Sequence, residues 1–130
     1  MRKTNGAQYV EVIAGKKIVK SGAVGATTVE EIKWLTDTLV SEAAAWKDTG
    51  WAYLVDITQM SPVSSEASLE LVNLHNRLGA SGCKIMAFVD GKSIFTAVQA
   101  KVHQKQSESD IQEAHFATEE EAVKWIDTVL

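Results

Sequence analysis

Alternating and continuous apolar stretches divide the chain into predicted strands and helices. Residues 8–13 alternate in polarity, with Val10 and Val12 on one face, and this pattern is typical of a half-buried strand. Residues 18–24 show a second strand pattern after the short turn at 14–17, which contains Gly and Lys. Because the link is short, we expect the two strands to form an antiparallel hairpin.

Two nearly unbroken apolar runs, at 51–57 and 85–89, predict the central strands of a sheet. Each run is too short for a helix and is bounded by turn residues. Since neither run alternates in polarity, we expect both strands to be covered on both faces, as strands of parallel sheets are. Residues 111–116 form a more polar run, which we expect at an edge of the sheet.

Segments with apolar residues at helical spacing separate these strands. The first helix is predicted to begin at Thr27 or Thr28, because each threonine lies three residues before a glutamate and fits a capping box. Its apolar stripe continues to about residue 47. Three further helices are predicted at 65–78, 94–102 and 118–130.

The predicted order of elements is therefore ββαβαβαβα, within a single domain over 1–130. Strands that alternate with helices imply parallel pairing and right-handed crossovers, with the first strand as the antiparallel member. We predict an α/β fold with a mixed, mostly parallel five-stranded sheet and four helices. Ligands and partners of such sheets tend to bind at the carboxyl ends of the parallel strands, which here are residues 56–63, 89–92 and 116–118.

Charge and composition exclude several classes of protein. The net charge is −4 and no segment is rich in Lys and Arg alone, which argues against binding to nucleic acid. The single cysteine, Cys83, cannot form an internal disulfide. No apolar run is long enough to cross a bilayer, and no apolar segment of a signal peptide follows the basic N-terminus. We therefore expect a cytoplasmic location.

The residues that could carry chemistry are scattered along the chain. The three histidines, His75, His103 and His115, fall on different predicted elements, and no two of them have metal-ligand spacing. Neither a Ser-His-Asp arrangement nor a glycine-rich phosphate-binding motif can be recognised, and Cys83 has no base positioned beside it in the sequence. We expect no catalytic residue, no metal ion and no cofactor.

Three stretches of the chain resemble the STAS domain of anti-sigma-factor antagonists. They are Leu-Val-Asp-Ile-Thr at 54–58 with the helix start at 64–65, the strand at 84–89, and His-Phe-Ala-Thr-Glu-Glu-Glu-Ala-Val at 115–123. The resemblance covers nearly the whole chain and is closer to the stand-alone bacterial members. It implies a non-catalytic regulatory module that works through protein–protein interaction.

In signalling members of that family, a turn reads Asp-Ser-Ser-Gly, and a partner kinase phosphorylates the serine after the aspartate. The corresponding residues here are Ser64, Ser65, Glu66 and Ala67, which makes Ser65 the phosphoacceptor position that the resemblance implies. Ser64, Glu66 and Ala67 depart from the motif. A helix N-terminus favours an anionic group, but the charge of Glu66 would repel an added phosphate.

The candidate partner-binding or phosphoacceptor turn thus contains six polar residues: Asp56, Thr58, Ser61, Ser64, Ser65 and Glu66. A structural interpretation also stands, in which Asp56 accepts bonds from loop N–H groups and Ser64 caps the next helix. Two other functions remain open. The same broad fold resembles lipid-binding CRAL-TRIO-type domains, which implies a carrier of a small apolar molecule or lipid, and a small enzyme would use Asp56 with one of the serines.

Trp34 is the tryptophan that falls outside the apolar stripe of its predicted helix, which Ile32, Leu35 and Leu39 form. An exposed tryptophan at this position would mark a contact with a partner or with a second copy of the chain. We therefore expect an unknown protein partner or a homodimer.

Overall fold

Six strands form one mixed sheet in the computed structural model, which describes residues 2–91 and 111–130. In chain order, the elements are β1 (Lys3–Asn5), β2 (Gln8–Val12), β3 (Ile18–Ala23), α1 (Val29–Glu42), the 3₁₀ turn η1 (Ala44–Trp46), β4 (Trp51–Asp56), α2 (Ser65–Ala80), β5 (Cys83–Val89), β6 (Gln112–Phe116) and α4 (Glu119–Val129).

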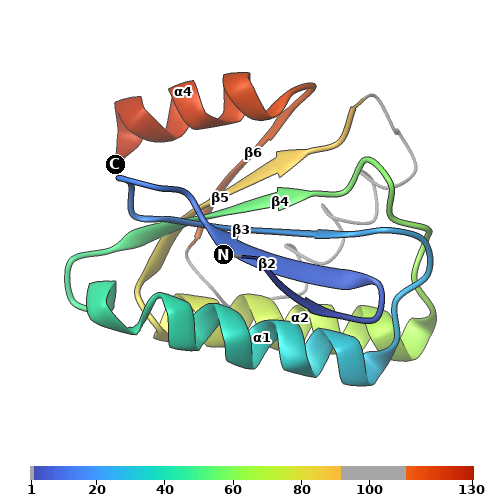
Figure 1. The fold of residues 1–130 in the computed structure, drawn as a ribbon. Helices are drawn as coiled ribbons and strands as arrows, with labels where there is room; N and C mark the ends of the chain where they lie inside the picture. The colour runs from blue at the N-terminus through green and yellow to red at the C-terminus, as the bar shows by residue number, and fades with distance from the viewer. Residues whose placement is uncertain (1, 92–110) are drawn as a thin grey trace.

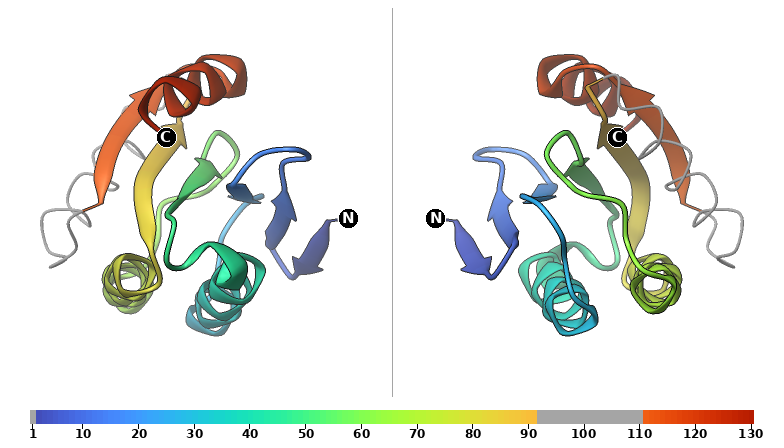
Figure 2. Two further views of the ribbon diagram at one scale, coloured as in Figure 1. Left: turned by 90° about the vertical axis from the view of Figure 1, so that its left-hand side faces the viewer. Right: turned by 90° about the vertical axis from the view of Figure 1, so that its right-hand side faces the viewer.

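The strands lie in the sheet in the same order as in the chain, from β1 to β6. β1, β2 and β3 pair antiparallel, whereas β3, β4, β5 and β6 pair parallel. Helices α1 and α2 cover one face of the sheet and α4 lies over the other (Figures 1 and 2). The predicted α/β class, the antiparallel first hairpin and the mostly parallel sheet are thus confirmed.

The count of strands differs from the prediction, because β1 adds a sixth strand where five were expected. Its three residues pair with β2, with Lys3 opposite Val10, and all three are exposed. A strand whose residues are all exposed leaves no hydrophobic pattern to read. The predicted helix at 94–102, His103 and the end of the predicted loop at 89–92 lie outside the described residues.

β4 and β5 are buried on both faces, as their continuous apolar runs predict. Tyr53 and Val55 of β4 belong to the core under α1 and α2, and the alternate residues Ala52 and Leu54 belong to a second core under α4. On β5, Phe88 joins the first core and is 4% exposed. The central pair of strands therefore separates the two hydrophobic cores.

The predicted capping box at the start of α1 is present. The backbone N–H of Glu31 donates to Thr28 Oγ1 at 3.2 Å, and the Thr28 N–H donates to Glu31 Oε1 at 2.9 Å. The helix was expected to reach about residue 47, but α1 ends at Glu42 and the chain tightens into η1. None of the helices in the described ranges is long and apolar enough to span a membrane.

Trp34 is half-buried and packs against the core under α1 and α2. Its indole therefore contributes to the packing of its own chain, and the expectation of an exposed tryptophan is wrong. A stripe drawn at ideal helical spacing is too narrow, because the apolar face of a core-facing helix spans 100° or more. The homodimer stays a prediction without this support.

A substitution at Phe88 tests the core under α1 and α2. We expect Phe88→Ala to destabilise the protein by about 3–5 kcal/mol, the usual cost of emptying a buried aromatic site. Val24, which is 60% exposed, is the control, and Val24→Ala should stay within about 0.5 kcal/mol of the parent. Denaturant unfolding measures both changes, and an unaltered midpoint for Phe88→Ala would contradict the described core.

Candidate functional site

The carboxyl ends of β3, β4, β5 and β6 meet at one edge of the sheet, because these strands are parallel. All three described α-helices begin at this edge, on the right of Figure 1. Their N-cap residues are Thr28, Ser64 and Thr118, and each side chain accepts a bond from the backbone N–H three residues later. The edge therefore gathers the helix N-termini and the loops that precede them.

The turn after β4 begins with a bonded pair, Asp56 and Thr58. The Thr58 N–H and hydroxyl both donate to Asp56 Oδ1, at 2.9 and 2.6 Å. Such a turn, in which an aspartate accepts the N–H two residues on, fixes the direction of the chain as it leaves the strand. The structure thus gives Asp56 the structural role that sequence analysis weighed against a functional one.

Backbone hydrogen bonds hold the middle of the turn against the loop that follows β3. The N–H of Gly25 donates to the carbonyl of Gln59 at 2.8 Å, and the N–H of Ser61 donates to the carbonyl of Gly25 at 2.9 Å. Gly25 has a φ of 80°, a conformation that glycine adopts without strain. Two loops far apart in sequence are therefore tied into one rigid rim.

The end of the turn is the N-terminus of α2. Ser64 is the N-cap, and its Oγ accepts the N–H of Ala67 at 3.1 Å. Ser65 and Glu66 follow in the first turn of the helix with exposed side chains, and Ser61 is half-buried. The six predicted residues therefore lie along one turn, with Asp56 and Thr58 bonded at its start and the two serines with Glu66 at its end.

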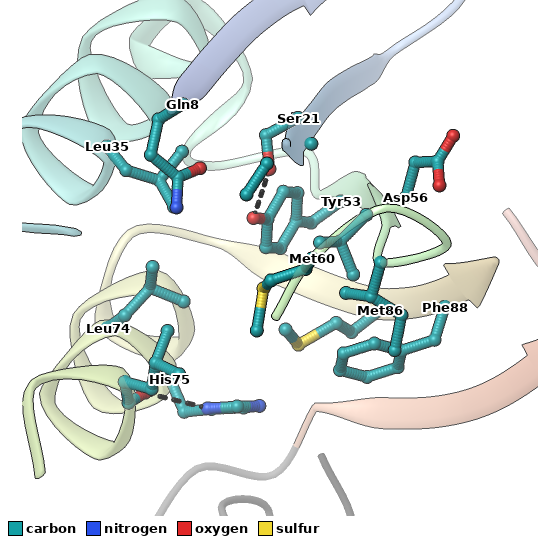
Figure 3. Close-up of a pocket in the computed structure, with 15 residues that line it drawn as sticks. Gln8, Ser21, Leu35, Tyr53, Asp56, Met60, Leu74, His75, Met86 and Phe88 are labelled. Carbon is teal, nitrogen blue, oxygen red and sulfur yellow. Dashed lines mark hydrogen bonds between the residues drawn. The ribbon is translucent and has the colours of Figure 1, made fainter. Parts of the chain in front are cut away.

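A small, mainly apolar cavity lies between the sheet and helices α1 and α2 (Figure 3). Its volume, as the space open to the centre of a water molecule, is about 40 Å³. Met60 and Met86 point into this space from the turn and from β5, and Leu35 and Leu74 line it from the helices. One water needs roughly 10–15 Å³ by this measure. The cavity therefore accepts a few waters or a small apolar group, and a lipid chain does not fit.

Two hydroxyls supply a polar wall of the cavity. The side chains of Ser21 on β3 and Tyr53 on β4 share a hydrogen bond. Burial raises the pKa of the Tyr53 phenol above its ordinary value, so the phenol stays protonated and one of the two hydroxyls donates to the other. This bond links β3 to β4 in the wall of the cavity.

A cluster of titratable groups that sequence analysis missed lies on the outer strand. His115 has one carboxylate at each ring nitrogen: Nδ1 is 3.2 Å from Asp90 Oδ2, and Nε2 is 3.1 Å from Glu113 Oε1. The imidazole stacks on Phe88 with ring centroids 4.8 Å apart. The second histidine, His75 of α2, reaches the same carboxylate, with Nε2 4.0 Å from Glu113 Oε2.

His75 and His115 do fall on different elements, as predicted, but the fold brings both of them to one carboxylate. Glu113 and His115 are two residues apart on β6 and lie opposite Met86 and Phe88 of β5. Both side chains therefore point to the face that α2 covers. The alternation of Glu and His along the strand was visible in the sequence, but the position of α2 over β6 was not.

Burial shifts the pKa values of His75 and Cys83. Burial lowers the pKa of His75 below the ordinary value of 6.5, while the Leu71 carbonyl and the Glu113 carboxylate act against this shift. Burial also raises the pKa of the Cys83 thiol to about 12, so this cysteine is unreactive at neutral pH. In the described part of the chain, no three His, Cys, Asp or Glu residues are arranged to hold a metal ion.

Comparisons with known proteins identify the fold. No protein-family model matches the chain, and no curated protein does. The chain is similar to the crystal structure of an uncharacterized protein from the DUF3478 family, with a SpoIIAA-like fold, from Shewanella loihica PV-4. The TM-score is 0.71 at 20% identity, over 96% of this chain and 98% of that one. The chain has a SpoIIAA-like fold. The predicted STAS-like fold is thereby confirmed.

The two serines at the start of α2 are predicted to differ in their contribution to stability. Ser64→Ala removes the N-cap bond to the Ala67 N–H and should cost about 1 kcal/mol. Ser65→Ala is the matched control, since its exposed side chain lies after the cap, and it should change stability by less than about 0.5 kcal/mol. Equal unfolding midpoints for the two variants would show that Ser64 does not cap the helix.

The lowered pKa of His75 predicts that the protein loses stability in mild acid. Because its pKa is lower in the folded protein than in the unfolded chain, the unfolded chain binds more protons below pH 6.5, and stability falls as the pH drops through this value. Thermal unfolding at about pH 7.5 and pH 5.5 should therefore show a smaller decrease for His75→Gln than for the parent. An identical pH dependence in both proteins would contradict this role.

Proposed function

We propose that the chain is a non-catalytic regulatory module of the STAS type, which binds a protein partner through the turn at residues 58–67. The observation that carries this proposal is the exposed, hydroxyl-bearing turn at the carboxyl end of the central strand β4. Ligands and partners of open α/β sheets tend to bind at this edge. The SpoIIAA-like fold supports a regulatory function, because this is what the resemblance to anti-sigma-factor antagonists implies.

The turn is suited to recognition because it is rigid before a partner binds. Its first part is held by the bonds from Thr58 to Asp56, and its middle by the bonds to Gly25. A surface that is ordered in advance loses less conformational entropy on binding than a flexible loop does. Hydrogen bonds within the chain therefore prepare the surface that we propose for the partner.

The chemistry of the turn favours a partner that presents an acidic group next to apolar side chains. The first N–H groups of α2 and the Ser65 hydroxyl are donors at the positive end of the helix dipole. Two exposed apolar residues flank the turn: Val24, beside the loop residue Gly25, and Leu69, one helical turn beyond Ser65. Together they offer charge complementarity and a small apolar contact area.

A catalytic function receives no support from the geometry of the turn. A serine nucleophile needs a base within hydrogen-bond distance. The carboxylate of Asp56 is instead engaged by Thr58, and the Ser64 hydroxyl is engaged by the Ala67 N–H. These bonds build a turn and a helix cap.

The cavity between the sheet and helices α1 and α2 supports the alternative function, a carrier of a small apolar molecule. Its lining is apolar apart from the bonded Ser21–Tyr53 pair and a few polar groups such as His75. Its volume limits the ligand to a group of a few heavy atoms, which argues against a lipid. We therefore place protein binding first.

Ser65→Glu tests the proposed partner surface. The variant should fold as the parent does, because an acidic residue in the first turn suits the helix dipole by about 0.3–1 kcal/mol. It should weaken the binding of an acidic partner by about tenfold, since two like charges then meet beside Glu66. Quantitative pull-down from the native cell measures the recovery of partners.

Two variants control this experiment. Ala45→Glu adds the same charge at an exposed site beyond the other end of α1 and should leave recovery unchanged. Ser64→Ala removes the helix cap without adding charge and separates a charge effect from a folding effect. Equal recovery of the same partners by Ser65→Glu, Ala45→Glu and the parent would show that the functional surface lies elsewhere.

A further inference from the structure

Two buried acceptor atoms face one another between α2 and β6. The Nδ1–H of His75 donates to the carbonyl of Leu71 at 2.9 Å, which leaves a lone pair on Nε2 of the neutral imidazole. That nitrogen lies 4.0 Å from Glu113 Oε2, and neither atom has a hydrogen-bond partner among residues 2–91 and 111–130. The two side chains are 3% and 5% exposed. Leaving such groups unsatisfied is unfavourable, so the pair is prepared to accept a donor.

The described groups next to this pair are His115 and a second carboxylate, Asp90. On β6, His115 bonds the other oxygen of Glu113, and Asp90, just after β5, bonds the far nitrogen of His115. On the other side of α2, the ion pair of Arg77 with Asp37 of α1 is exposed to solvent. Solvent screens that pair, and among the described residues the carboxylate of Glu113 is the charged group that acts on His75.

A proton on His75 Nε2 would turn the contact from two facing acceptors into a charge-assisted hydrogen bond. Such bonds between nitrogen and oxygen span about 2.7–2.9 Å, so the pair would have to close by roughly 1 Å. His75 belongs to α2 and Glu113 to β6, and closing the gap draws these two elements together. The bond from His115 holds Glu113 in place during the change.

We propose that His75 and Glu113 form an acid-triggered latch between α2 and β6, which is open while His75 is neutral and closes when His75 takes up a proton. Burial of His75 opposes the proton, and the carboxylate of Glu113 partly offsets this cost. The latch therefore closes below the ordinary range of histidine titration, at mildly acid pH.

The latch has a consequence for the proposed partner surface. α2 is one continuous helix from Ser65 to Ala80, and His75 lies ten residues, or about 15 Å, from its first residue. A helix of this length moves as a unit, so a shift at His75 reaches the turn at 58–67. This consequence rests on the proposed function, whereas the latch itself does not.

Glu113→Gln separates the latch from simple burial of a histidine. The glutamine keeps an oxygen for His115, and its amide can donate to the neutral His75 Nε2, so the variant should fold and hold His75 in its neutral form. Long-range proton–nitrogen NMR spectra of the imidazoles, recorded between about pH 8 and pH 5, follow the protonation of His75. The midpoint should lie below 6.5 in the parent and lower still, by about half a pH unit or more, in Glu113→Gln.

The amide resonances report the movement of the helix. In the parent, the Ala67 amide should shift with the same midpoint as the His75 imidazole, and this shift should be absent in His75→Gln. Asp37→Asn, which removes the exposed partner of Arg77, is the control and should leave both midpoints unchanged. If Glu113→Gln does not fold, the comparison of His75→Gln with the parent still decides whether His75 drives the shift at the turn.

Three results would overturn the latch. The His75 midpoint could be the same in Glu113→Gln as in the parent, or the Ala67 shift could persist in His75→Gln. Added Zn²⁺ at about pH 7.5 could also perturb both side chains, which would mean that the two acceptors hold a metal ion and not a proton. The recovery of partners by Ser65→Glu has no bearing on these NMR measurements. Failure of the proposed function, which equal recovery would show, can therefore be distinguished from failure of the latch.

Discussion

β4 pairs with β3 on one side and with β5 on the other, and all of its residues but the last are buried. This double pairing fixes the register of the parallel strands, so the strands end together at one edge of the sheet. Every loop that leaves this edge then starts from a defined position. The turn at 58–67, the N-termini of α1 and α2, and the floor of the cavity all depend on this constraint.

Two pairs of buried polar side chains in the described part of the chain differ in whether their members bond one another. Ser21 and Tyr53 share a hydrogen bond in the cavity wall, and they act as structural anchors. His75 and Glu113 do not, because two acceptor atoms meet at a distance too long for a hydrogen bond. A fold tolerates such a pair at a cost in stability, and unsatisfied groups of this kind concentrate at places that bind something or change state.

The candidate turn lies at the N-terminus of α2, and the titratable cluster contacts the second half of the same helix through His75. The bonds described above for the turn join residues close in sequence, apart from those to Gly25. The cluster is non-local, and joins α2 to β6 across nearly forty residues of chain. Helix α2 connects the two, so a change in the cluster has a direct mechanical route to the turn.

The sequence by itself determined the order of elements, the two buried central strands, the antiparallel first hairpin and the helix caps at Thr28 and Ser64. These features follow from hydrophobic periodicity and from hydrogen bonds over three residues, both of which a linear sequence carries. The tertiary structure alone decided that β1 adds a strand, that Trp34 packs inward, and that His75 meets Glu113. Each of these depends on which elements become neighbours, because backbone pairing of a polar strand, the width of a helix face and a contact between distant segments leave no periodic signal in the chain.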